Sequence, residues 1–251
     1  MNPLAVITGT SSGIGKTLAL GLLEKNWDVV GIARREGAIA HENYHHVRLD
    51  LTRLEQVAGY FEQTLPREVT LAGRPKVALV NNSGVLDPVG PVEDLPLEQL
   101  ATAFTLNSAV PLWLMGCMTR MVGDAPLTMI NISSGAATKP LAGWAAYCST
   151  KAALLMAGRA YGEDIAHNAR YRTRRARLAV VSYSPGVTNT PMQDQVRTFG
   201  TDAFPGVDRF IQLKEAGEVK GPELPVAEMM ALLERDDLPP FSDVTYGKKG
   251  G

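Results

Sequence analysis

Apolar runs alternate with helical stretches along most of the chain. Runs such as LAVIT at 4–8 and KVALV at 76–80 are apolar at nearly every position, which is typical of strands covered on both faces. Stretches with apolar residues spaced by three and four positions lie between such runs. The pattern predicts six strands, at 4–8, 28–33, 46–51, 76–80, 127–132 and 176–182.

The same periodicity predicts the connecting helices. In the segment 14–25, Leu18, Leu22 and Leu23 fall on one face. Strands that alternate with helices form a parallel, doubly wound sheet with helices on both faces. We therefore expect an α/β Rossmann fold, with residues 1–251 as a single domain because no low-complexity linker divides the chain. The other predicted helices cover 54–65, 97–121 and 147–166.

The alternation stops after Pro185. Residues 192–221 contain no clear strand and mix charged residues with Phe199, Phe204 and Phe210. Ligands of open α/β sheets bind beyond the carboxyl ends of the strands, where long loops are commonly lids. We expect about 191–221 to be a substrate lid inserted after the sixth strand, with a packing or oligomer element as the alternative. The tail, 241–251, is expected to be frayed.

Composition and charge narrow the class of protein. The 251 residues carry a net charge of −1, so nothing global favours nucleic acid or a membrane surface. No run reaches the ~18 apolar residues of a membrane span, and no cleavable leader precedes the first strand. We therefore expect a cytoplasmic protein with neither a nucleic-acid nor a membrane partner. The charge run RYRTRRAR at 170–177 is interpreted as a solvated face, with an anion-contacting patch as the alternative.

The two cysteines, Cys117 and Cys148, lack metal-ligand spacing. Both stand in apolar, helical surroundings, so we predict buried reduced thiols and no metal site.

The block TGTSSGIG at 8–15 lies between the first strand and the first helix. Gly9, Gly13 and Gly15 allow a tight turn and a close approach of the backbone to a pyrophosphate, and the helix N-terminus offers free N–H groups. The spacing TGxxxGxG differs from the commoner GxGxxG, so its place between strand and helix carries the argument. The block predicts a dinucleotide site, with a purely structural turn as the alternative.

The end of the second strand bears on the choice of cofactor. An acidic side chain there would bind the adenine ribose and repel a 2′-phosphate. This chain has Ala33 instead, followed by Arg34 and Arg35, whose guanidinium groups suit a phosphate. We therefore favour NADP(H), although either arginine could simply be solvated. Asp50 follows the third strand and is expected to meet the adenine edge.

Tyr147 and Lys151 stand four residues apart, on one face of a predicted helix. Free tyrosine has a pKa near 10, and a neighbouring ammonium favours the phenolate, so we expect Lys151 to lower the pKa of Tyr147. Ser134, at the end of the apolar run TMINIS, is expected to hydrogen-bond a substrate oxygen and stabilise its developing charge. Asn107 can hold a water that links Lys151 to solvent. Together these groups indicate hydride transfer to or from a carbonyl carbon, whereas a Tyr–Lys pair alone would be read as a surface pair.

Six motifs, in this order, resemble those of the classical short-chain dehydrogenases/reductases: TGTSSGIG, NNSG at 81–84, Asn107, Ser134, YCSTK at 147–151 and PGVTNT from Pro185. They cover about three quarters of the chain, and NNSG departs from the usual NNAG by one hydroxyl. The resemblance implies a Rossmann domain that forms a homodimer or homotetramer, with Ser134, Tyr147 and Lys151 as the catalytic set and Asn107 as its fourth member. The resemblance and the motifs themselves also indicate which residues bind the cofactor. These are Gly9, Ser11, Ser12, Gly13, Ile14, Gly15, Arg34, Arg35, Asp50, Leu51, Asn82, Gly84, Tyr147, Lys151, Pro185, Gly186 and Thr188.

Two segments, 133–156 and 183–193, are similar to the sepiapterin reductase and bacterial benzil reductase branch of this family. That branch reduces α-diketone-like carbonyls with NADPH. Sepiapterin reductases carry acidic residues after PG, one of which anchors the pterin, whereas this chain has Asn189 and Pro191 there. The tail also lacks the family's usual final strand-and-glycine pattern.

The resemblance therefore implies an NADPH-dependent carbonyl reductase for a small α-diketone or aromatic ketone, with Tyr147 as proton donor. Trp144, three residues before the tyrosine, and Met192, at the start of the lid, are expected to border the substrate, with a packing role for Trp144 as the alternative. The alternatives are sepiapterin reductase, 3-oxoacyl or other short-chain alcohol dehydrogenase activity. A protein that only senses the dinucleotide is a further alternative, but it would have no need of a complete Ser–Tyr–Lys set.

Overall fold

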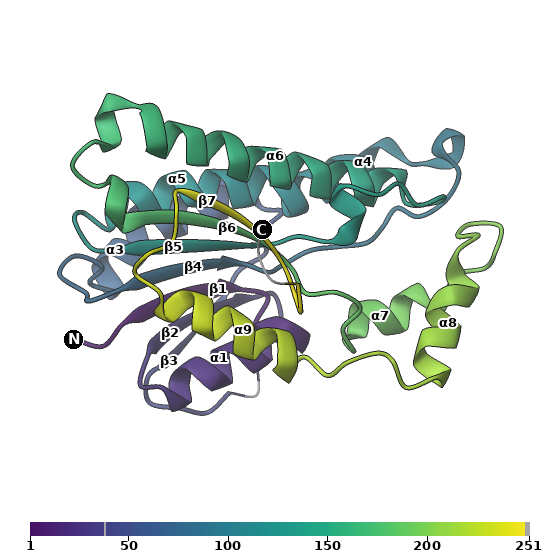
Figure 1. Cartoon of the computed structure of the whole chain (residues 1–251), viewed down its shortest axis with the longest axis horizontal. Helices are drawn as coiled ribbons and strands as arrows, with labels where there is room; N and C mark the ends of the chain where they lie inside the picture. Colours follow the sequence, from purple (N-terminus) through teal and green to yellow (C-terminus); the bar gives the residue numbers. More distant parts are fainter. Residues whose placement is uncertain (38, 249–251) are drawn as a thin grey trace.

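Seven parallel strands form one sheet, in the order β3-β2-β1-β4-β5-β6-β7, in a computed structural model of the chain (Figure 1). The structure describes residues 1–37 and 39–248. The predicted parallel, doubly wound sheet is confirmed. The strands are β1 (Leu4–Thr8), β2 (Asp28–Ala33), β3 (Tyr44–Arg48), β4 (Val77–Asn81), β5 (Leu127–Ile132), β6 (Leu178–Ser184) and β7 (Phe241–Thr245).

Helices cover both faces of this sheet (Figure 1). One face is covered by α1 (Gly13–Glu24) and α9 (Glu223–Glu234), which also contact each other. Two further helices, α7 (Pro191–Val196) and α8 (Val207–Glu215), lie beyond the sheet in the predicted lid segment. The helices of the other face are α2 (Leu54–Gly59), α3 (Leu65–Glu68), α4 (Leu97–Phe104), α5 (Val110–Met121) and α6 (Ala145–His167).

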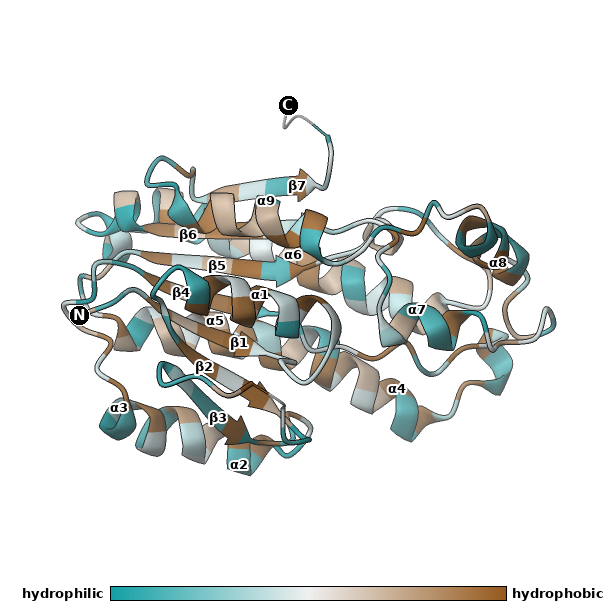
Figure 2. Ribbon diagram, turned by 90° about the horizontal axis from the view of Figure 1, so that it is seen from below, coloured by the Kyte–Doolittle hydropathy of each residue, from teal (hydrophilic) through white to brown (hydrophobic). Residues whose placement is uncertain are grey.

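The central strands send alternate side chains into two separate cores. In β1, Leu4 and Val6 belong to the core beneath α5, whereas Ala5 and Ile7 belong to the core beneath α1 and α9. Because both faces are buried, the strand is apolar at consecutive positions, and Figure 2 shows β1, β4, β5 and β6 as largely hydrophobic. This explains why the apolar runs predicted these strands closely.

The two edge strands were predicted less well. β3 spans Tyr44–Arg48 instead of 46–51, and four of its five side chains are at least partly exposed. The expectation of a frayed tail is wrong for Phe241–Thr245, which forms β7 and pairs in parallel with β6. The final strand is therefore present although its family pattern is not, and residues 249–251 lie outside the described residues. The side chains of these two edge strands are mostly not buried, so their apolar signal in the sequence is weak.

The predicted helix 97–121 is confirmed as one long element that contains a π-helical turn at Thr105–Ala109. By length and composition this stretch is apolar enough to cross a membrane. Its buried side chains, including Leu114, Met115 and Met118, instead pack in the core against the sheet. A core helix is therefore the better interpretation of its hydropathy.

The arginine run at 170–177 is not simply a solvated face. Arg174, Arg175 and Arg177 donate hydrogen bonds to the backbone carbonyls of Thr119, Ile165 and Asp124, respectively. These bonds connect the end of α6 to the end of α5 and the turn that follows it, so the run also has a structural role.

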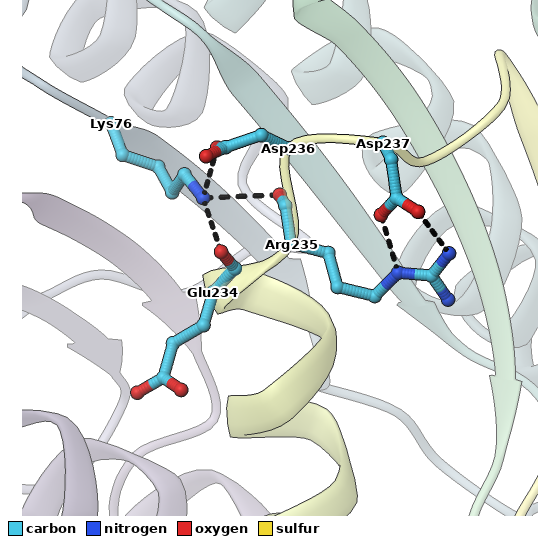
Figure 3. Close-up of polar contacts among 5 residues, drawn as sticks. All are labelled: Lys76, Glu234, Arg235, Asp236 and Asp237. Atoms are coloured by element: carbon cyan, nitrogen blue, oxygen red, sulfur yellow. Dashed lines mark hydrogen bonds and ion pairs between the residues drawn. The ribbon is translucent and has the colours of Figure 1, made fainter.

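Lys76, just before β4, caps the carboxyl end of α9 (Figure 3). Its Nζ donates to the carbonyl oxygens of Glu234 and Arg235, both at 3.0 Å, and lies 2.7 Å from Oδ1 of Asp236. An ammonium group at this end of a helix compensates the free carbonyls and the negative end of the dipole. The contact fixes α9 against the sheet.

Candidate active site

A cleft of about 510 Å³ opens at the carboxyl ends of the strands, where the sheet order reverses between β1 and β4. Six predicted site residues do not line it: Gly13, Gly15, Asn107, Trp144, Gly186 and Thr188. The predicted site residues that do line it are Gly9, Ser11, Ser12, Ile14, Arg34, Arg35, Asp50, Leu51, Asn82, Gly84, Ser134, Tyr147, Lys151, Pro185 and Met192.

The glycine block forms the tight turn from β1 into α1. Gly9 and Gly13 have φ values of 79° and 56°, which disfavour any other residue. A Cβ atom at Gly9 would lie 2.7 Å from Nδ2 of Asn82, and one at Gly15 would collide with the same nitrogen and with the carbonyl of Gly9. Gly13 and Gly15 therefore shape the turn without lining the cleft.

Asn82 and Thr8 tie this turn to the end of β4. Asn82 Nδ2 donates to the carbonyls of Thr8 and Gly9, at 2.9 and 3.2 Å. In return, Thr8 Oγ1 accepts from the backbone N–H groups of Asn82 and Ser83, both at 3.0 Å. This two-way contact explains why an asparagine stands at position 82, beside the glycine turn.

Arg34 and Arg35 are exposed at one end of the cleft, directly after β2. Asp50 lies nearby, and its carboxylate accepts hydrogen bonds from the backbone and hydroxyl of Thr52, at 3.0 and 2.8 Å. Burial works to raise the pKa of Asp50, but these bonds and the charges of Arg34 and Arg53 leave it below its usual value. This end of the cleft thus presents two guanidinium groups and one carboxylate.

Tyr147 and Lys151 lie together in the cleft wall, on the first turns of α6, and both are buried. The ammonium of Lys151 lies 5.7 Å from the centre of the Tyr147 ring and donates to the carbonyl of Ile132 at 2.8 Å. Ser134 begins the short turn after β5, where its hydroxyl accepts from the N–H of Ala136. The structure therefore places all three predicted groups in one cleft.

Burial opposes the expected effect of Lys151 on Tyr147. It raises the pKa of Tyr147 to about 12, although the hydrogen bond with Ser134 works in the opposite direction. It lowers the pKa of Lys151 to about 8. The expectation of a lowered tyrosine pKa is therefore wrong for the ligand-free protein, because desolvation of the phenolate outweighs the hydrogen bond with Ser134.

Asn107 lies in the π-helical turn and is completely buried. Its side chain is occupied on both sides, since Oδ1 accepts from the N–H of Val85 and Nδ2 donates to Val85 O and Thr150 Oγ1. The side chain therefore fixes the loop after β4 to α6. A Cβ atom at Gly84 would lie 3.1 Å from Asn107 Oδ1, so a larger residue there would have to displace this side chain.

Trp144 does not border the cleft as expected. It is only 4% exposed and packs edge-on against Tyr147 at 5.4 Å between ring centroids. On its other side it stacks on Phe204 at 4.6 Å and contacts Phe210 at 5.5 Å. Trp144, directly before α6, thus connects Tyr147 to the aromatic side chains of the lid segment. Met192, at the start of α7, does line the cleft.

Two predicted cofactor-binding residues, Gly186 and Thr188, lie outside the cleft wall. Gly186 has a φ of 73° but is not part of the cleft wall, and Thr188 is buried with its hydroxyl bonded to the carbonyl of Pro185 at 3.1 Å. These two residues shape the turn after β6. Cys117 is a buried free thiol as predicted, whereas Cys148 is a free thiol that is only half-buried, so the prediction of burial is wrong for it. Among the described residues no group of three or more metal-ligating side chains is present.

Sequence reasoning missed two polar residues at the substrate end, Asp87 and Gln195. Gln195 Nε2 donates to Oδ2 of Asp87 at 2.6 Å. Asp87 stands three residues after NNSG, and Gln195 stands in the predicted lid. Neither carries a motif, and only the folded chain brings them together.

A known protein family matches most of the chain. The family model described as short chain dehydrogenase matches residues 3–200. The chain belongs to the short-chain dehydrogenase family. It is therefore an oxidoreductase of a family that acts on CH–OH or C=O groups with nicotinamide dinucleotides.

Curated relatives cover nearly the whole chain. The chain is 32% identical to "Benzil reductase ((S)-benzoin forming)" of Bacillus subtilis, over 92% of this chain and 93% of that one. It is 29% identical to the sepiapterin reductase of Bos taurus, over 93% of this chain and 90% of that one. The similarity to this branch of the family is thus confirmed.

Among solved structures, the KRED1-Pglu enzyme is 26% identical to the chain. The match covers 97% of this chain and 100% of that one, with a TM-score of 0.77. The Rossmann-like fold of the family is therefore shared over nearly the whole chain.

Proposed function

We propose that the protein is an NADPH-dependent carbonyl reductase that reduces a small α-diketone or aromatic ketone, with Tyr147 as the proton donor. One observation carries this proposal: Ser134, Tyr147 and Lys151 share a single cleft with the glycine turn and with Arg34 and Arg35. A protein that only binds the dinucleotide would not need a buried acid and ammonium beside the site.

The residues present fit a dinucleotide. The turn from β1 into α1 lines the cleft through Gly9, Ser11 and Ser12, and the N-terminus of α1 offers free backbone N–H groups to a phosphate there. The loop and Ile14 would hold the pyrophosphate end, Asp50 and Leu51 the adenine, and Lys151 the nicotinamide ribose. Arg34 and Arg35 would bind a 2′-phosphate, which favours NADPH over NADH. When bound, the reduced nucleotide supplies the hydride.

Tyr147 is suited to donate a proton. Its pKa of about 12 keeps the hydroxyl protonated at neutral pH, as reduction of a carbonyl requires. Ser134 would donate a hydrogen bond to the carbonyl oxygen and stabilise the charge that develops there. The Tyr147 hydroxyl would give its proton to the same oxygen, which then becomes the oxygen of the alcohol. Lys151 stabilises the resulting tyrosinate.

The substrate end of the cleft supports a compact, neutral carbonyl compound. Met192 offers adaptable apolar contact, and residues 186–193 contain no carboxylate to anchor a pterin. The similarity to the benzil reductase of Bacillus subtilis supports a substrate of this kind. Sepiapterin reductase activity is the second candidate, because Asp87 gives the cleft a carboxylate from another loop.

The remaining expectations concern the whole protein. Residues 191–221 would act as the lid, since α7 lines the cleft and α8 packs on Trp144 through Phe210. Phe104, Leu112 and Met156 leave apolar surface exposed on α4, α5 and α6, which supports a homodimer or homotetramer. We also place the protein in the cytoplasm, without a nucleic-acid or membrane partner.

The Tyr147→Phe variant tests the proposal. It removes the hydroxyl and keeps the ring, so the packing against Trp144 and the binding of NADPH should survive. Benzil reduction, followed by NADPH absorbance, should fall by about 10²–10⁴-fold, the usual contribution of a general acid. The assignment fails if the variant keeps more than about a tenth of wild-type turnover.

A further inference from the structure

The substrate end of the cleft holds a polar pair that joins its two sides. Asp87 lies on the loop after β4, and Gln195 lies on α7, 108 residues further along the chain. Both line the cleft together with Tyr147 and Met192. The bond between them, at 2.6 Å, therefore joins the loop after β4 to the lid helix α7 across the wall of the cleft that also holds Tyr147.

This bond fixes the orientation of the Gln195 amide. An ionised carboxylate only accepts hydrogen bonds, so the amide atom that faces Asp87 must be the nitrogen. An amide nitrogen carries two hydrogens, and one of them is given to Asp87. Among the described residues the structure records no acceptor for the other one. Gln195 is half-buried, so this N–H is a donor that the lid carries at the cleft wall.

We propose that Gln195 determines specificity for 1,2-dicarbonyl substrates by donating this N–H to the second carbonyl oxygen, the one that is not reduced. Ser134 and Tyr147 donate to the first oxygen, so the inference rests on the proposed function. A 1,2-diketone carries two acceptor oxygens on adjacent carbons, so a second donor in the cleft can bind the oxygen that is not reduced. A monoketone has no group for the second donor.

Asp87 acts as a positioning residue in this arrangement. It holds the Gln195 amide with its nitrogen toward the cleft, so the lid presents a donor and not an acceptor. Without Asp87 the amide could turn and place its oxygen against the oxygen of the substrate. That contact would be repulsive, because both atoms carry partial negative charge. The geometry therefore selects for a second carbonyl and not for a hydroxyl that must donate.

Two substrates with one skeleton separate this role from general effects. Benzil and deoxybenzoin differ only in that a methylene group replaces one carbonyl. In Gln195→Met, kcat/KM for benzil with NADPH should fall by about 5- to 10-fold, the worth of one hydrogen bond, while deoxybenzoin changes less than about twofold. Gln212→Met, an exposed glutamine on α8 outside the cleft, serves as the control and should leave both values unchanged.

Variants of Asp87 test the positioning role. Asp87→Asn keeps an acceptor oxygen for the Gln195 amide and should retain most of the preference for benzil. Asp87→Leu should lose it as Gln195→Met does. Equal losses for benzil and deoxybenzoin in Gln195→Met, or no loss for either, would overturn the inference and leave the proposed function intact. A wild-type protein that reduces deoxybenzoin but not benzil would also overturn it. A wild-type protein that reduces neither compound would overturn the proposed function itself.

Discussion

Burial controls the proton chemistry of the two central residues. Tyr147 and Lys151 are 7% and 4% exposed, and each has its pKa shifted toward the neutral form. A protonated tyrosine beside a largely charged lysine is the state that reduction needs at neutral pH. The reverse reaction would need a tyrosinate, which the ligand-free site disfavours.

The pKa of about 8 for Lys151 predicts a pH-dependent stability. In the unfolded chain this lysine titrates near 10.5, so between pH 8 and 10.5 the unfolded state binds more protons. The free energy of unfolding should therefore rise with pH in that window. Relative to Lys151→Met, the wild type should gain about 1–2 kcal/mol between pH 7 and 9.5 in urea titrations. A difference that stays constant with pH would contradict the buried, titrating ammonium.

Arg34 should decide between the two nucleotides. Its guanidinium is exposed at the cleft, so Arg34→Ala should weaken NADPH binding by about 10- to 100-fold, as expected for one hydrogen bond to a charged group. NADH binding should hardly change. Arg53→Ala is the control, because Arg53 is exposed but does not line the cleft. Titration of tryptophan fluorescence would measure both affinities, and an equal loss for NADPH and NADH would contradict the assignment.

Residues in local motifs were predictable because their geometry is local. Four residues of helix bring Lys151 beside Tyr147 whatever the rest of the chain does. The contact of Asp87 with Gln195 depends on the course of 108 residues, and no pattern indicates it. The stacking of Trp144 on Phe204 is of the same kind. The placement of Trp144 in the cleft wall was wrong for that reason.

At the scale of elements, strands with two buried faces were predicted closely, the edge strand β3 was predicted with shifted bounds, and the edge strand β7 was missed. Consecutive apolar residues identified β1, β4 and β5, whereas β7 has a serine and an aspartate among its five residues. β7 is held in the sheet by its parallel pairing with β6, which its own sequence does not indicate. Helix α9 was missed as well, although it completes the core on α1.

Lys76 should stabilise this C-terminal part of the fold. Lys76→Met removes two hydrogen bonds to the last carbonyls of α9 and an ion pair with Asp236. We expect a loss of about 1–3 kcal/mol in the free energy of unfolding, because the Lys76 side chain is only 14% exposed and its partners would be left without it. The exposed Lys139, replaced in the same way, should change stability by less than about 0.5 kcal/mol. Equal urea midpoints for the two variants would show that the cap contributes nothing.

At the scale of the molecule, the sheet order places the site. The strand order reverses between the parallel neighbours β1 and β4, so the glycine turn and the NNSG loop meet at one end of the sheet. β5 and α6 add Ser134 and Tyr147 at the same end, and the lid helices lie beyond it (Figure 1). The alternation of strands and helices is sufficient to predict this end as the site. Which substrate it accepts depends on the lid contacts, and these are not visible in the alternation.

The preference between benzil and sepiapterin tests the account most directly. Purified full-length protein would be assayed with each compound and NADPH, with product analysis to identify benzoin. The account predicts a higher kcat/KM for benzil, because the cleft combines apolar lid contacts with donors for two carbonyl oxygens. It also predicts much slower turnover when NADH replaces NADPH. A clear preference for sepiapterin, or equal efficiency with the two nucleotides, would contradict it.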